Sequence, residues 1–224
     1  MLRFTLLAAA LMICACNRPE KPAAPTQTAA APTPPTPAAA TDLRPAIVCF
    51  GDSITAGFGL EAGESFPDLL QKDVDGRGLR YRVVNLGVSG DTTQDGVARM
   101  SMALAEKPAV VLLELGGNDG LRGIPLAITQ ANLVQMIEAF QAAGAKTVLA
   151  GMSLPPNYGA AFIGKFEAMY KELAAKYKLA LIPFLLEGVG GHDDLMQRDG
   201  IHPNAAGARK VEAIVMKVLA PLLK

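Results

Sequence analysis

Ser53 is the residue of this sequence most suited to covalent chemistry. It lies in the run Gly51-Asp52-Ser53, directly after the short apolar segment 46–50. That segment has the length and the branched side chains of a buried strand, and in an open α/β sheet ligands bind just beyond the carboxyl ends of the strands. A serine there can cap a helix or act as a nucleophile, and the triplet alone does not decide between the two.

A serine hydroxyl is a weak nucleophile unless a base removes its proton, and the chain has only two histidines, His192 and His202. Asp199 precedes His202 by three residues, a spacing that can turn both side chains to one side of a single turn. The carboxylate could then hold Nδ1 of the imidazole and leave Nε2 free for Ser53. In a plainer interpretation Asp199 is a helix cap and His202 a surface residue before Pro203.

Two further loops could supply hydrogen-bond donors to a developing oxyanion. Gly90 follows the strand expected at 81–85, and Asn118 follows the strongly apolar strand expected at 109–115. The backbone N–H groups of Ser53 and Gly90, together with the Asn118 amide, would stabilise a negatively charged oxygen. Alternatively, Gly90 is a turn glycine and Asn118 forms an Asx turn or a cap. We favour the catalytic interpretation because four separate loops supply one consistent set of groups.

His192 offers a second possible site. With Asp193, Asp194, Asp199 and His202 it provides the ligand types that a divalent metal accepts. No second histidine stands at tight metal spacing, so we interpret this segment as a solvated loop. We expect neither a metal nor an organic cofactor.

The elements between these loops must bring them together. From Ala46 onward, apolar runs of strand length alternate with segments of helical periodicity. The alternation predicts a three-layer α/β/α fold with a five-stranded parallel sheet in the flavodoxin-like order 2-1-3-4-5. We expect strands at 46–50, 81–85, 109–115, 146–150 and 179–182. We expect helices at 66–74, 93–106, 124–143, 162–177 and 205–219.

The first 44 residues indicate export. Residues 1–16 begin with a positive charge, continue with an apolar run too short for a comfortable membrane span and end in Cys16. Ala15 before Cys16 resembles a bacterial lipobox, so we expect a lipidated Cys16 that anchors the protein in the bacterial cell envelope, on the periplasmic side or the cell surface. A plain secretory signal is the alternative. Residues 17–44, rich in Ala, Pro and Thr, predict an extended tether, and residues 45–224 form the folded domain.

Composition excludes some kinds of partner. The formal net charge is zero, and the chain has no Trp, 4 Tyr and 8 Phe. A neutral chain without basic runs argues against nucleic acid, and few aromatic side chains are available for stacking on sugars. The length suits one domain with a substantial core, and we expect a monomer.

The four polar blocks resemble those of the SGNH (GDSL-type) hydrolase family. They are Gly-Asp-Ser at Ser53, Ser-Gly-Asp-Thr at Gly90, Gly-Gly-Asn-Asp at Asn118 and Asp-Gly-Ile-His-Pro at His202. The stretches 114–123 and 154–159 are similar to the branch of envelope esterases, acyl-CoA thioesterase I and lysophospholipases. The resemblance covers residues 46–222.

This resemblance implies a serine esterase that hydrolyses acyl esters or thioesters through an acyl-enzyme. It implies that Ser53, Asp199 and His202 are the catalytic triad. It also implies that Ser53, Gly90 and Asn118 form the oxyanion hole, and that Asp52 supports the turn.

Loops expected to border the site suggest the substrate. Leu121, Leu154, Pro155 and Tyr158 could form an apolar groove for an acyl group, or they could be ordinary loop packing. The glycines of segment 120–125 could make it a mobile lid. We expect a lysophospholipid or a short to medium acyl ester as substrate. The alternatives are a carbohydrate O-acetylesterase of the envelope and a non-catalytic lipid-binding lipoprotein.

Overall fold

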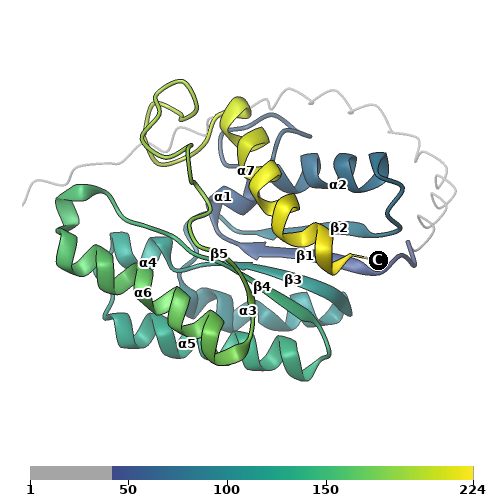
Figure 1. The fold of residues 1–224 in the computed structure, drawn as a ribbon, viewed down its shortest axis with the longest axis horizontal. Coiled ribbons are helices and arrows are strands. Elements are labelled where there is room, and N and C mark those ends of the chain that lie inside the picture. The colour runs from purple at the N-terminus through teal and green to yellow at the C-terminus, as the bar shows by residue number, and fades with distance from the viewer. Residues whose placement is uncertain (1–41, 224) are drawn as a thin grey trace, which may run out of the picture. The chain divides into compact units, whose positions relative to one another are not determined.

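A single parallel sheet organises the part of the chain that the computed structural model describes, residues 42–223. The expected signal segment, Cys16 and residues 17–41 of the expected tether lie outside these described residues. The strands are β1 (Ala46–Gly51), β2 (Arg82–Gly87), β3 (Pro108–Glu114), β4 (Lys146–Ala150) and β5 (Ala180–Ile182). They pair in parallel in the order β2-β1-β3-β4-β5 (Figure 1), which confirms the predicted topology.

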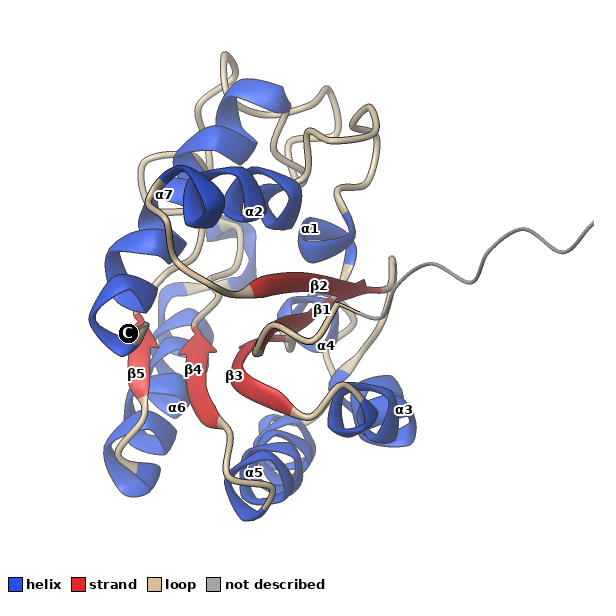
Figure 2. Ribbon diagram, turned by 90° about the vertical axis from the view of Figure 1, so that its right-hand side faces the viewer, coloured by secondary structure: helices blue, strands red, loops and turns tan. Residues whose placement is uncertain are grey.

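Helices cover both faces of the sheet (Figure 2). One face carries α2 (Phe66–Gly76) and α7 (Ala205–Leu219), and the other carries α3 (Thr93–Ala105), α5 (Leu126–Ala142) and α6 (Ala160–Tyr177). The loops also contain two 3₁₀ turns, η1 (Pro156–Tyr158) and η2 (Ala220–Leu222). None of the helices in residues 42–223 is long and apolar enough to cross a bilayer.

Two one-turn helices begin directly after the central strands. They are α1 (Ser53–Ala56), after β1, and α4 (Gly117–Leu121), after β3. We did not predict them from the sequence, because a helix of four or five residues is too short to show a helical period. Both begin at the carboxyl edge of the sheet and carry candidate site residues there.

The core lies around the two inner strands β1 and β3. Every residue of β1 is buried, and so is nearly every residue of β3. Phe50 at the end of β1 packs edge-to-face on Phe140 of α5, with ring centroids 5.7 Å apart. A rigid, fully covered strand therefore ends one residue before the turn that carries Ser53.

β2 continues two residues beyond the predicted end. Its last residue, Gly87, pairs with Gly51, and a Cβ at Gly87 would lie 2.1 Å from the backbone nitrogen of Ala56. Only glycine allows this close approach, so Gly87 brings the end of β2 against α1.

Candidate active site

Ser53 is the first residue of α1, at the carboxyl end of β1. Asp52 caps this helix, since its Oδ1 accepts a hydrogen bond from the N–H of Ile54 at 3.0 Å. Gly57, with φ +77°, ends the helix after one turn. Ser53 is only 9% exposed, and its position is set by short connections to a buried strand.

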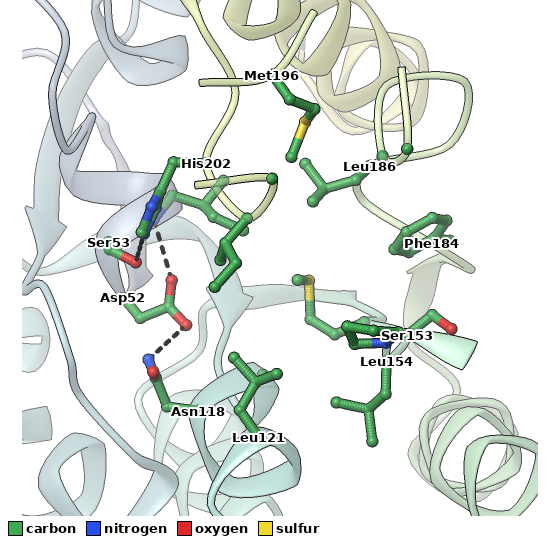
Figure 3. Close-up of a pocket in the computed structure, with 18 of the residues that line it drawn as sticks. Asp52, Ser53, Asn118, Leu121, Ser153, Leu154, Phe184, Leu186, Met196 and His202 are labelled. Atoms are coloured by element: carbon green, nitrogen blue, oxygen red, sulfur yellow. Dashed lines mark hydrogen bonds between the residues drawn. The ribbon is translucent and has the colours of Figure 1, made fainter. Parts of the chain in front are cut away.

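His202 bridges Ser53 and Asp199, as the sequence predicted. Its Nε2 lies 2.8 Å from the hydroxyl oxygen of Ser53, and its Nδ1 lies 2.7 Å from Oδ2 of Asp199. The Ser53–His202 bond appears as a dashed line in Figure 3. The other oxygen of Asp199 accepts hydrogen bonds from the backbone N–H groups of Ile201 and His202, at 2.9 and 3.0 Å. The three side chains thus form one continuous hydrogen-bonded chain.

The surroundings of Asp199 favour its ionised form. Partial burial would raise the pKa of this carboxyl, but the hydrogen bonds from the His202 ring and from the two backbone N–H groups lower it to about 2. Asp199 therefore carries a negative charge at neutral pH and can keep the Nδ1 proton of His202 in place.

The loop that carries His202 is held on both sides. Asn204 caps α7 by accepting hydrogen bonds from the N–H groups of Ala206 and Gly207. On the other side, the N–H of Gln197 donates to the carbonyl of His202 at 2.7 Å. The exposed ring of Phe58 lies against the imidazole, with centroids 4.6 Å apart. Sequence reasoning missed this contact, because the residue lies far from His202 in the chain.

Backbone donors for an oxyanion are available beside Ser53. Within the described residues, the N–H groups of Ser53 and Gly90 donate to no protein acceptor. Gly90 has φ +87°, and its carbonyl accepts a hydrogen bond from Arg122 at 2.9 Å. The amide nitrogen of Asn118 donates to Oδ2 of Asp52 at 3.1 Å and to the carbonyl of Asp91 at 2.9 Å. An oxyanion would have to replace one of these two acceptors to gain the Asn118 donor.

Arg99 connects the loops of the site, and sequence reasoning did not identify it. From α3 it forms an ion pair with Asp91, the neighbour of Gly90. It also donates to the carbonyls of Leu86 and Gly51, both at 2.8 Å. One guanidinium therefore fixes the ends of β1 and β2 to the loop that carries the Gly90 donor.

A cavity of about 500 Å³ opens beside Ser53 and His202. Most of its lining is apolar, and the labelled lining residues come from several separate segments of the chain (Figure 3). The predicted groove residues Leu121, Leu154 and Pro155 line this cavity. Tyr158 lies outside the lining, and its hydroxyl donates to the carbonyl of Leu121 at 2.8 Å. Sequence reasoning missed Phe184, Leu186 and the lining residue Met196, which follow β5.

His192, the second histidine, is exposed, and its backbone carbonyl accepts hydrogen bonds from Leu195 and Met196. Within residues 42–223, no group of three or more histidine, cysteine, aspartate or glutamate side chains is arranged to hold a metal ion.

Known proteins resemble this chain over nearly its whole described length. The sequence pattern of the GDSL-like Lipase/Acylhydrolase family matches residues 49–210. Esterase TesA of Pseudomonas aeruginosa is 49% identical over 178 residues, which cover 79% of this chain and 89% of that protein. The thioesterase 1/protease 1/lysophospholipase L1 of Escherichia coli K12 is 39% identical over 178 residues, or 79% of this chain and 84% of that protein.

Solved structures agree with these relatives. The crystal structure of TesA superimposes with a TM-score of 0.77 at 49% identity, covering 80% of this chain and 99% of that one. The psychrotrophic esterase EstA of a Pseudoalteromonas species superimposes with a TM-score of 0.75 at 32% identity, covering 79% of this chain and 97% of that one.

Proposed function

The chain belongs to the GDSL-like lipase/acylhydrolase family and is an esterase, and from this premise we propose that it hydrolyses single-chain acyl esters at the bacterial envelope, with Ser53 as nucleophile. One observation carries the proposal. The hydrogen-bonded chain of Ser53, His202 and Asp199 lies beside a largely apolar cavity. The arrangement supplies a nucleophile, its base and room for an acyl group in one place.

The geometry supports a two-step reaction. The Ser53 hydroxyl oxygen attacks the ester carbonyl carbon while Nε2 of His202 takes its proton. The carbonyl oxygen, now negative, is stabilised by the N–H groups of Ser53 and Gly90 and by the Asn118 amide. His202 then gives the proton to the leaving alcohol or thiol. Water, activated by the same histidine, releases the acyl group from Ser53. Asp199 holds the imidazole in the tautomer that both steps require.

The size and polarity of the cavity favour an acyl chain over a bare acetyl group. The cavity volume of about 500 Å³ lies in the range of pockets that enclose small organic ligands. Its apolar wall, formed by Leu121, Met152, Leu154 and Phe184 among others, would remove an aliphatic chain from water. The activities named for the relatives, esterase, thioesterase and lysophospholipase, all act on acyl groups. We therefore propose a lysophospholipid or a short to medium acyl ester as substrate.

The purified full-length protein should be assayed on p-nitrophenyl esters from acetyl to palmitoyl, on lysophosphatidylcholine and on acetylated xylan. The proposal expects an optimum at acyl chains longer than acetyl and release of fatty acid from the lysophospholipid. Activity confined to acetyl groups, with deacetylation of xylan, would replace it by a carbohydrate O-acetylesterase. No ester hydrolysis at all would favour a lipid-binding protein.

The proposed envelope location rests on the sequence of residues 1–44, with its lipobox-like Ala15-Cys16 and its tether composition. A Cys16→Ser variant expressed in a bacterium should leave the membrane fraction and take up no labelled palmitate. The matched Cys14→Ser variant should behave like the wild type. Palmitate incorporation in Cys16→Ser would refute lipidation at this residue.

A further inference from the structure

The side chain of Glu114, the last residue of β3, is fully buried next to the nucleophile turn. Its Oε2 accepts hydrogen bonds from the backbone N–H of Asp52 at 3.1 Å and from the hydroxyl of Thr55 at 2.8 Å. These two residues lie on either side of Ser53, so one carboxyl group holds both ends of the turn. Its other oxygen, Oε1, is buried and has no hydrogen-bond partner among the described residues.

A second buried carboxyl lies beside it. Asp52 is 3% exposed, and its oxygens accept hydrogen bonds from the Ile54 N–H and from the Asn118 amide. Burial raises the pKa of Asp52 to about 6. It also raises the pKa of Glu114 well above its usual value, and the negative charge of Asp52 raises it further. Two adjacent buried carboxyl groups do not ionise together at neutral pH.

The hydrogen bonds indicate which carboxyl keeps the proton. Both Asp52 oxygens accept from N–H donors, which stabilise an anion. The Oε1 atom of Glu114 has no such donor, and a bare anionic oxygen at full burial is strongly disfavoured. Each of these observations places the proton on Glu114.

The other groups at this site offer no compensation for a second negative charge. Burial raises the pKa of the Cys49 thiol on β1 and of the Tyr170 hydroxyl on α6, and the charge of Glu114 would raise each further. The cation of α3 at this edge, Arg99, is already paired with Asp91. The space is also closed, since a Cβ at Gly51 would lie 2.4 Å from Oε2 of Glu114.

We propose that Glu114 remains a neutral carboxylic acid in the working enzyme and is a positioning residue for the Ser53 turn. Through Oε2 it accepts hydrogen bonds from the Asp52 N–H and the Thr55 hydroxyl, and the neighbouring Asp52 carboxylate in turn holds the amide of Asn118. The proposal depends on the roles proposed above for Ser53 and Asn118. A negative charge at Glu114, whose carboxyl holds the turn that carries Ser53, would oppose the developing oxyanion in a medium of low dielectric constant.

Infrared difference spectra of the full-length protein at neutral pH test the proton directly. Subtracting the Glu114→Gln spectrum from the wild-type spectrum should leave the carbonyl band of a protonated carboxylic acid. The exposed Glu172 on α6 supplies the matched control, because Glu172→Gln should remove carboxylate bands only. A Glu114→Gln difference spectrum that contains only carboxylate bands would overturn the proposal.

Kinetics test the positioning role. Glu114→Ala should lower kcat by about 10²-fold, because small displacements of reacting groups cost about that much, while KM stays within a few fold. Gln keeps the shape and neutrality of the protonated acid, so Glu114→Gln should restore most of the lost kcat. If Glu114→Gln is as slow as Glu114→Ala, or if Ala leaves kcat unchanged, the positioning role is wrong.

Two outcomes keep this test separate from the proposed function. If Glu114→Ala fails to fold, the infrared spectrum and the kcat of Glu114→Gln still decide the matter, since slow turnover in that folded variant overturns the proposal. If Ser53→Ala is as active as the wild type, the nucleophile assignment fails, whereas the infrared band still reports the state of Glu114.

Discussion

Replacement of Asp199 by asparagine should damage catalysis more than removal of its side chain. Oδ1 of Asp199 accepts hydrogen bonds from the N–H groups of Ile201 and His202, while Oδ2 faces Nδ1 of His202. An asparagine at this position would accept the hydrogen bonds of the two N–H groups with its carbonyl oxygen, because its NH₂ group cannot accept a hydrogen bond. Its NH₂ would then face Nδ1 and force the imidazole proton onto Nε2. That is the atom that must take the proton of Ser53.

The two variants should differ by about two orders of magnitude. The wrong tautomer costs about 10⁴-fold in kcat in a comparable triad. Asp199→Ala removes all three hydrogen bonds of the carboxylate, but only the one to the His202 ring acts on the base directly. A hydrogen bond to a charged group is worth about 1.5–3 kcal/mol, which corresponds to about 10- to 160-fold in kcat. The smaller loss is expected because the Asp199 side chain is 38% exposed, so water can replace the carboxylate at Nδ1.

Steady-state kcat on one p-nitrophenyl ester at neutral pH should be lower for Asp199→Asn than for Asp199→Ala. Circular dichroism should show both variants folded. The exposed Asp193 in the same loop gives the matched control, since Asp193→Asn should retain wild-type kcat. If Asp199→Ala is as slow as Asp199→Asn or slower, the tautomer argument is refuted.

Three other changes test separate parts of the structure. The lysine of an Arg99→Lys variant cannot reach Asp91 and the two carbonyl oxygens at once. The variant should therefore be less stable by about 2 kcal/mol, its Tm should fall by about 4–8 °C, and its kcat should also fall. An unchanged thermal transition would contradict this. Glu212 is partly buried, and burial and the nearby charge of Asp73 raise its pKa from 4.5 to about 7. The folded state therefore holds this proton more tightly than the unfolded state does, and the free energy of unfolding falls as pH rises from about 4.5 to about 7. Glu212→Gln should therefore raise Tm at pH ~8 by about 2–4 °C, which corresponds to about 1 kcal/mol of stability after solvent screening. Near pH ~4.5 it should leave Tm unchanged. Equal shifts in Tm at both pH values would show that ionisation of Glu212 is not the cause. Leu121→Trp should fill part of the cavity and lower kcat/KM for long acyl esters about tenfold, with acetyl ester hydrolysis retained; an unchanged chain-length profile would place the acyl group elsewhere.

The fold and the convergence of the site loops could be predicted because they depend on long, regular patterns. The inner strands are apolar runs of ordinary length, and polar loops follow the strands at the same sheet edge. Even so, the predicted helix 124–143 begins at Leu126, since Pro125 stands at its N-cap position. The helices α1 and α4 escaped prediction because each has only four or five residues.

The groups that position the catalytic side chains could not be predicted in the same way. Arg99 lies in an amphipathic helix, where an arginine ordinarily faces solvent, and only the three-dimensional fold brings it to three loop ends. Phe58 contacts His202 across more than a hundred residues of chain. Glu114 did offer a signal, as a single carboxyl group within an apolar run expected to be buried. The lipid anchor at Cys16 and the tether stay predictions.

Covalent labelling tests the central claim most directly. The full-length protein and its Ser53→Ala variant should be treated with a p-nitrophenyl alkylphosphonate, which leaves a stable adduct on an activated serine. The account predicts one adduct per wild-type chain, located on the peptide that contains Ser53, with activity lost in proportion to labelling. The variant should be neither labelled nor active. An adduct on another residue, or ester hydrolysis by Ser53→Ala at the wild-type rate, would contradict the assignment of Ser53 as the nucleophile.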